Sequence, residues 1–305
     1  MKNTLEQLKA QLPNTTGEER LDLLIEISDA SGRAHKPDVL DYVDEGLELA
    51  EALKSYRKKV RLYEIQNHVH RAAQRLEESR ESAKRMLEIC KENDFKKRSI
   101  AALRYIAVTY QTDLDKERYW LEKALKEAQQ INDAKELIWI HNSLGGINHQ
   151  KMLFNEATTH SLKAVEMAQE LQDKEMIGIS YFGLSTVVEN EQSIEYLKKA
   201  VEIFEGMNHT YYCYMAYLQL GHAFEKYGYL EDGIKAVDKG VEIAERLKSN
   251  TKLILAYNRK VELLILQATQ DAEIVDKTLI KEAETLIDKA ISFMVRIIDI
   301  FLLRN

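Results

Sequence analysis

Residues 220–240 read LGHAFEKYGYLEDGIKAVDKG, and this stretch decides the fold. A Leu-Gly pair opens it, and small residues follow at Gly233 and Gly240, which lie 13 and 20 positions after the leucine. Small side chains at such intervals let two helix backbones approach closely, while leucine, isoleucine, valine and aromatic residues fill the space between them. The stretch therefore predicts two antiparallel helices joined by a short turn.

The same spacing occurs in residues 144–164, LGGINHQKMLFNEATTHSLKA, where Ala157 and Ala164 take the places of the two glycines. A five-residue motif also occurs seven times. Its order is a compact residue, an apolar residue, a polar residue, a second apolar residue and usually an alanine. Successive copies start 40, 38, 40, 36, 40 and 50 positions apart. Such a period indicates stacked repeats, because one helix pair cannot bury its own apolar face. The copies start at Gly46, Met86, Ala124, Ala164, Ala200, Gly240 and Ala290.

Residues 220–240 resemble the tetratricopeptide repeat (TPR) family in their Leu-Gly pair, their aromatic-Gly-aromatic turn at residues 227–229 and their paired small residues. The pitch is nearer 40 than the usual 34 residues, which is similar to the repeats of bacterial transcriptional and signalling regulators. The resemblance covers about residues 18–300. It implies an all-α fold, namely a right-handed superhelical solenoid of about seven antiparallel helix pairs, in a single domain of residues 1–305.

Proline is nearly absent, which supports helices throughout the chain. The only two prolines are Pro13 and Pro37, so every later residue is free of the strongest helix breaker. Residues 112–115 and 189–192 predict trimmed turns, whereas residues 270–276 lengthen the last connection. We expect a short helix at residues 3–11 and helix pairs at residues 18–53, 56–92, 96–131, 135–171, 174–206, 210–247 and 251–301.

The formal net charge is -7, and lysine and arginine are spread along the chain. Nucleic acid is therefore not an expected partner, because phosphate neutralisation needs a concentrated basic surface. The densest local group is interpreted as the solvated face of a helix. It consists of Lys54, Arg57, Lys58, Lys59 and Arg61.

Cys90 and Cys213 are the only cysteines, and they lack the spacing of a zinc or redox motif. They are expected to be small buried residues in a reducing compartment. Residues 1–6, MKNTLE, have no apolar run of signal-peptide length, and the apolar C-terminal segment is too short to span a membrane. We expect a cytoplasmic protein.

The sequence holds no recognisable catalytic or metal site. His68 and His70 are two positions apart, on different sides of a helix, and His141 and His149 are eight apart. No pair has the i, i+4 spacing of a helical zinc site. Neither a phosphate-binding glycine loop nor a nucleophile elbow occurs. Catalytic residues, cofactors and metals are not expected, although an enzyme hidden in the helical array stays open.

In this architecture the first helix of each pair lines a concave groove. Positions two before and two or five after the apolar core anchors share one helical stripe and are expected to face inward. Together they mix amide, imidazole, guanidinium and aromatic groups that can bind a peptide, although each residue alone is more simply interpreted as part of a solvated face. The expected groove residues are Tyr63, Asn67, His70, Arg104, Gln111, Trp139, Asn142, His149, Phe182, Glu189, Tyr214, His222, Glu225 and Arg259.

The segment from Ile287 onward is apolar on nearly all sides, which is unusual for the end of a solenoid. It either packs within the last helix pair or docks on something outside the chain, such as a second copy or a downstream domain. We favour docking, because one helix cannot cover a fully apolar circumference. A homodimer would use Ile291, Met294, Ile298, Phe301 and Leu302.

These features favour a non-catalytic scaffold that binds a protein or peptide in its concave groove and acts in bacterial signalling or regulation. Two alternatives stay open. One is a receptor for a short signal peptide that changes the curvature of the array on binding. The other is the regulatory segment of a cyclase or kinase whose output domain lies outside this sequence.

Overall fold

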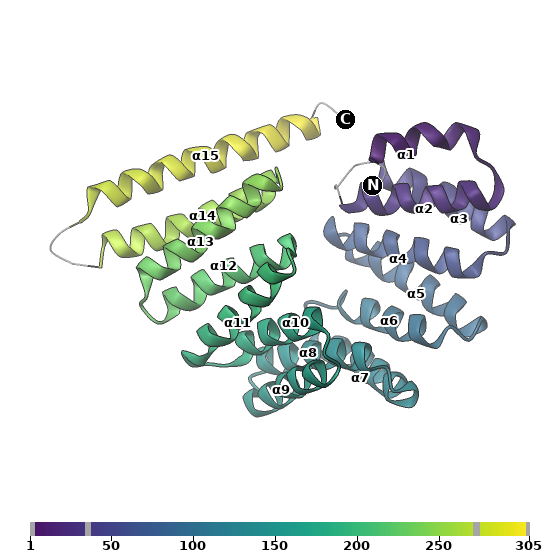
Figure 1. Cartoon of the computed structure of the whole chain (residues 1–305), viewed down its shortest axis with the longest axis horizontal. Coiled ribbons are helices and arrows are strands. Elements are labelled where there is room, and N and C mark those ends of the chain that lie inside the picture. Colours follow the sequence, from purple (N-terminus) through teal and green to yellow (C-terminus); the bar gives the residue numbers. More distant parts are fainter. Residues whose placement is uncertain (1–3, 34–37, 271–274, 303–305) are drawn as a thin grey trace. The chain divides into compact units, whose positions relative to one another are not determined.

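The computed structural model describes residues 4–33, 38–270 and 275–302, with side chains up to residue 295 in the last helix. Every regular element in these residues is a helix (Figure 1). The elements are α1 (Leu5–Gln11), the 3-10 turn η1 (Leu12–Asn14), α2 (Gly17–Arg33), α3 (Val39–Ala52), α4 (Tyr56–Ala72), α5 (Leu76–Glu92), α6 (Lys96–Ala107), α7 (Leu114–Ile131), α8 (Ala134–Gln150), α9 (Phe154–Glu170), α10 (Lys174–Val187), α11 (Gln192–Gly206), α12 (Thr210–Lys226), α13 (Leu230–Arg246), α14 (Asn250–Ala268) and α15 (Lys277–Leu302).

The expected helices are confirmed. The short first helix is α1, the pair expected at residues 18–53 is α2 with α3, and helices within the bounds of the later pairs follow in order to α14 and α15. The helices expected to pair at residues 135–171 are α8 and α9, which belong to different compact units of the chain, so their pairing stays a prediction. Many of the turns between them close in the same way. In the turn after α3, for example, Lys54 adopts a left-handed conformation with φ of 54°, and the Ser55 amide donates to the Ala50 carbonyl at 2.9 Å.

The expectation of shortened turns at residues 112–115 and 189–192 is wrong. In these two helix pairs it is the first helix, α6 or α10, that is short. α6 has 12 residues and α10 has 14, whereas α4, α8 and α12 have 17 each. The connections that follow these short helices, residues 108–113 and 188–191, are longer than the three-residue turn 53–55. At the end of α6 the Thr109 hydroxyl donates to the Ile106 carbonyl at 2.7 Å, which satisfies a carbonyl that a longer helix would have used.

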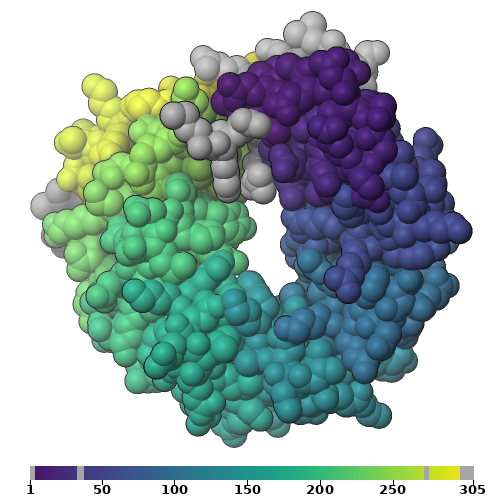
Figure 2. Space-filling model, turned by 45° about the vertical axis from the view of Figure 1, so that its right-hand side comes forward, coloured from purple at the N-terminus to yellow at the C-terminus, as the bar shows by residue number. Residues whose placement is uncertain are grey.

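The chain forms two compact units, unit 1 of residues 1–152 and unit 2 of residues 153–305. In unit 1 each helix from α1 to α8 packs against the next, and the first helices α2, α4, α6 and α8 also contact one another in that order. Figure 2 shows the successive pairs of unit 1, from purple to blue, in direct contact. In unit 2 the helices from α9 to α15 also pack in sequence, and α12 contacts α14. The single domain expected from the sequence stays a prediction.

The Leu-Gly pair brings α12 and α13 together. A β-carbon at Gly221 would lie 2.5 Å from Cγ2 of Val237 and 3.3 Å from the carbonyl oxygen of Gly233. Leu220 and Val237 beside this contact are buried. The spacing of 13 residues between Leu220 and Gly233 therefore marks a position where the two helix backbones come close together.

Cys90 and Cys213 are buried free thiols, as expected. Burial raises the pKa of Cys90 to about 12, so its thiol stays protonated at neutral pH. Among the described helices, none has both the length and the apolar character that crossing a bilayer requires.

Candidate binding faces on the first helices

The first helices of unit 1 form a continuous surface, because each of α2, α4 and α6 contacts the next first helix as well as its own partner. Charged and aromatic side chains from these helices meet one another across the helix boundaries. We call them the unit 1 face: Asp29, Arg61, Glu64, His68, Arg98, Arg104, Tyr105, Glu136 and Trp139.

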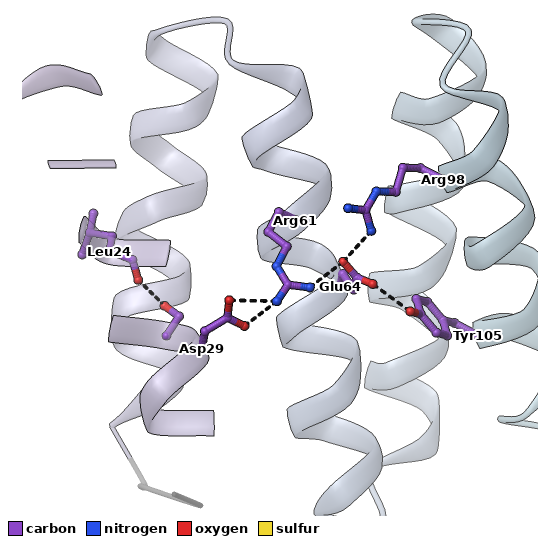
Figure 3. Close-up of polar contacts among 7 residues, drawn as sticks. Leu24, Asp29, Arg61, Glu64, Arg98 and Tyr105 are labelled. Carbon is purple, nitrogen blue, oxygen red and sulfur yellow. Dashed lines mark hydrogen bonds and ion pairs between the residues drawn. The ribbon is translucent and has the colours of Figure 1, made fainter. Parts of the chain in front are cut away.

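A chain of charged groups crosses the unit 1 face from α2 to α6 (Figure 3). Arg61 on α4 donates to both carboxylate oxygens of Asp29 on α2, at 2.6 and 2.8 Å. Its other terminal nitrogen donates to Glu64 at 2.7 Å, one turn further along α4. Arg98 and Tyr105 on α6 donate to the same carboxylate, at 2.9 and 2.7 Å. Glu64 thus links α4 to α6, and Arg61 extends the chain to α2.

Glu64 is buried, with 8% of its side chain exposed, and its surroundings keep it ionised. Burial alone would raise the pKa of Glu64, but hydrogen bonds from Arg61 and Tyr105 and the charge of Arg98 lower it below the ordinary 4.5. Burial raises the pKa of Tyr105, and the charge of Glu64 raises it further, so this phenol stays a donor. The carboxylate is therefore a fixed acceptor on the face.

We expect Glu64→Gln to lower the free energy of unfolding by about 1–2 kcal/mol at neutral pH, because two arginines then lose a buried counter-charge. The folded-state pKa of Glu64 lies below its unfolded value near 4.5, so the stabilisation is complete above that pH and is lost as pH falls through the folded value. Denaturant unfolding of both proteins across this range checks the prediction. A difference that stays constant down to the most acidic pH would contradict it.

A second cluster joins α6 to α8. Arg104 donates from Nε to Glu136 at 2.7 Å, and the two side chains are only 14% and 18% exposed. The Arg104 guanidinium lies 5.4 Å from the centre of the Trp139 ring and 5.5 Å from that of Tyr105. A guanidinium held by a carboxylate and two rings has little freedom to move, so the half-buried Trp139 is presented beside fixed neighbours.

His68 extends the unit 1 face along α4. Its ring meets Tyr105 edge-on, with centroids 5.0 Å apart. Desolvation by the surrounding protein, and then the charge of Arg71, lower the pKa of His68 below 6.5, although the residue is exposed to solvent. Arg61, Glu64 and His68 occupy positions i, i+3 and i+7, which lie on one side of a helix. This spacing of polar residues is the sequence signal that could have identified them.

A second face lies on α12 and α14 of unit 2. Glu225 accepts a hydrogen bond from Arg259 at 2.9 Å, and Nδ1 of His222 lies 3.6 Å from the same carboxylate. Large apolar side chains on the same two helices remain open to solvent. Tyr211, Met215 and Leu255 are 51%, 37% and 55% exposed. We call these six residues the unit 2 face.

The structure brings several of the expected groove residues together. Arg104 contacts Trp139 in unit 1, and Glu225 contacts both His222 and Arg259 in unit 2. Glu189 is exposed and pairs with Lys226 at 2.5 Å. The partner-binding role of these residues stays a prediction. Five further expected residues are half-buried: Tyr63, His70, Asn142, His149 and Phe182.

Two expected groove residues are wrong, because both are buried. Asn67 is fully buried, and its amide donates to the carbonyl and hydroxyl oxygens of Ser79 at 2.7 and 2.8 Å, which ties α4 to α5. Tyr214 is 2% exposed, and its hydroxyl donates to the Lys252 carbonyl at 2.8 Å, which ties α12 to α14. Gln111 is exposed in the connection after α6, which ends at residue 107, and its partner-binding role stays a prediction.

One side of α15 packs on α14, where Phe293 stacks on Tyr257 with centroids 6.3 Å apart. Ile291 and Met294 remain 46% and 44% exposed. The side chains of the other three residues expected in a homodimer contact, Ile298, Phe301 and Leu302, lie outside the described residues. The homodimer stays a prediction.

No family model and no curated protein matches the sequence. A Rap protein complexed with competence and sporulation factor is 18% identical, with a TM-score of 0.60 over 97% of this chain and 90% of its own. NprR in complex with its cognate peptide NprX is 13% identical, with a TM-score of 0.60 over 97% and 92%. A signal transduction ATPase with a tetratricopeptide repeat sensor, from Pyrococcus horikoshii, is 15% identical, with a TM-score of 0.52 over 92% and 47%.

The fold is TPR-like. At these identities the likeness concerns the fold, and it agrees with the helix pairs that residues 220–240 predicted. The unit 1 and unit 2 faces therefore lie on the first helices of TPR-like pairs.

Proposed function

We propose that this TPR-like chain is a non-catalytic regulator that binds an extended peptide, or an extended segment of a protein, on its first-helix faces. The observation that carries the proposal is the Arg104–Glu136 pair beside Trp139. Arginine and aromatic side chains supply much of the binding energy at protein interfaces. Because the Arg104 guanidinium is already held by its neighbours, it loses little conformational entropy when a partner binds.

Two proteins of similar fold support a peptide as the partner and bacterial signalling as the context. NprR was crystallised with its cognate peptide, and its apo form is described as a quorum sensor from B. thuringiensis. A Rap protein was crystallised with competence and sporulation factor. Of the alternatives left open by the sequence, these likenesses favour a receptor for a short signal peptide.

The chemistry of the unit 1 face supports binding rather than catalysis. The lowered pKa of Glu64 and its three donors make this carboxylate a poor proton acceptor. We further infer a cytoplasmic protein that does not take nucleic acid as its main partner, since the net charge of -7 opposes phosphate. Self-association through the exposed apolar side of α15 belongs to the same proposal.

Selection from a randomised library of short peptides on the full chain tests the proposal. We expect enriched peptides that bind Trp139→Ala about tenfold or more weakly than the wild type, because an aromatic anchor is removed from the face. Fluorescence anisotropy measures the affinities, and circular dichroism confirms that the variant is folded.

Lys84→Gln is the matched control, since Lys84 is an exposed residue of α5 outside both faces. It should leave every affinity unchanged. A library that yields no enriched peptide, or peptides that bind Trp139→Ala and the wild type equally well, would sink the proposed use of the unit 1 face.

A further inference from the structure

A cavity of about 520 Å³ opens on unit 1, and Arg98 is the residue that it shares with the ion-pair chain. It is formed by the first turn of α4, the turn between α5 and α6, and the first turn of α6. Four cationic side chains line it, from Arg57, Lys96, Lys97 and Arg98, and the acidic residue in its lining is Asp94. We call it the basic pocket. The lining of the basic pocket is positively charged, whereas the whole chain has a net charge of -7.

The charges of two of these cations are balanced by buried carboxylates. Lys97 lies 3.0 Å from Asp133, and Arg98 lies 2.9 Å from Glu64. Each of these carboxylates has 8% of its side chain exposed, so both pairs are anchored in the fold. Arg98 in this way connects the basic pocket to the unit 1 face.

The other two cations are not balanced in this way. Arg57 lies over the Phe95 ring at 5.4 Å, and no carboxylate in the described part of the chain forms an ion pair with it. Lys96 reaches Asp94 only at 3.9 Å, with 64% of its side chain exposed. The positive charges of Arg57 and Lys96 in the pocket are therefore available to pair with a ligand.

The wall of the pocket also includes carbon surface. Val60 is 1% exposed and belongs to the core of unit 1, and the half-buried Phe95 packs against the same core. One small anion would fill only a minor part of this volume, since a water molecule takes about 30 Å³. The lining therefore fits a group that joins a carboxylate to apolar atoms.

We propose that the basic pocket binds an acidic side chain of a peptide segment in which acidic and apolar residues are neighbours. Arg57 and Lys96 would pair with the carboxylate, and the half-buried Phe95 would contact the apolar neighbour. This inference rests on the proposed peptide-binding function and names the chemistry of the peptide. The peptide would continue from the pocket to the unit 1 face by way of Arg98, which contacts Glu64.

Anisotropy with two labelled octapeptides tests the proposal on the full chain, one alternating Leu with Glu and the other alternating Leu with Gln. We expect the Glu peptide to bind the wild type more tightly than the Gln peptide, and to bind Arg57→Gln/Lys96→Gln about tenfold more weakly. Its affinity should fall as salt rises, because exposed charges are screened. Lys84→Gln removes one exposed positive charge elsewhere on unit 1 and should leave the affinity unchanged.

Three outcomes would overturn the assignment. The Gln peptide could bind the wild type as tightly as the Glu peptide, or the double variant could bind the Glu peptide like the wild type. Inorganic phosphate alone could also saturate the protein and lose its affinity in the double variant, which would identify a site for small anions rather than peptides.

The Trp139→Ala variant separates this inference from the proposed function. If library-selected peptides lose affinity for Trp139→Ala but not for Arg57→Gln/Lys96→Gln, the basic pocket is excluded while peptide binding stands. If neither variant weakens any peptide, both proposals fail.

Discussion

Replacing Glu64 by alanine is expected to lower the free energy of unfolding by about 2–3 kcal/mol, because three side chains lose the hydrogen-bond acceptor that this buried carboxylate supplies. Glu64 accepts hydrogen bonds from Arg61, Arg98 and Tyr105. After its removal Arg61 keeps Asp29, but Arg98 and the Tyr105 hydroxyl lose the carboxylate that accepts their hydrogen bonds. Urea or guanidinium unfolding at pH 7 measures the difference.

Glu88→Ala is the matched control for this prediction. Glu88 is 63% exposed on α5, and its ion-pair contact is Arg85 at 3.8 Å. Such a surface pair contributes about 0–1 kcal/mol, and alanine is the better helix former. If the two variants unfold at the same denaturant concentration, Glu64 is not the link between helices that its contacts imply.

Gly221→Ala is expected to destabilise unit 2 by about 1–3 kcal/mol, through overpacking. The new β-carbon would lie 2.5 Å from Cγ2 of Val237, a fully buried β-branched residue whose side chain is held in one rotamer within its helix. The carbonyl oxygen of Gly233 would lie 3.3 Å from the same β-carbon, so the β-carbon cannot move toward that side to relieve the clash. Thermal unfolding and the crystal structure of the variant would measure the cost and the shift of α13.

Gly146→Ala is the control, since Gly146 is also helical and a β-carbon there would meet no atom within 4 Å. Without a clash, alanine should stabilise α8 by up to about 1 kcal/mol through its higher helix propensity. Gly221→Ala that behaves like Gly146→Ala would show that α12 and α13 can separate without loss, and that the Leu-Gly pair does not set their distance.

The two short repeats show where interpretation of the sequence reached its limit. The spacings of 38 and 36 residues located the irregular repeats correctly, since both α6 and α10 differ from their counterparts. The missing residues were assigned to the turns, whereas they are missing from the helices. The spacing between two motifs gives only the number of residues between them. It does not show whether a side chain such as the Thr109 hydroxyl will bond the Ile106 carbonyl at the end of a helix.

The groove residues illustrate a second limit. Helical periodicity correctly grouped Asn67 with Tyr63 and His70 on one stripe, but the stripe that carries the ion pairs is the neighbouring one, with Arg61, Glu64 and His68. Adjacent stripes differ by about 100° of rotation, which is one residue along the helix. Only the packing of α5 against α4 decided that Asn67 would be buried against Ser79.

The sequence by itself determined the helices, their order and their pairing within each unit, because small residues at a steady pitch and the near absence of proline act locally and between neighbours along the chain. The tertiary structure decided which charges meet. Arg61 and Arg98 lie 37 positions apart in sequence and share one carboxylate, because α4 and α6 pack side by side in unit 1. Contacts of that range depend on the rotation and tilt of each helix, which no spacing within a single helix can specify.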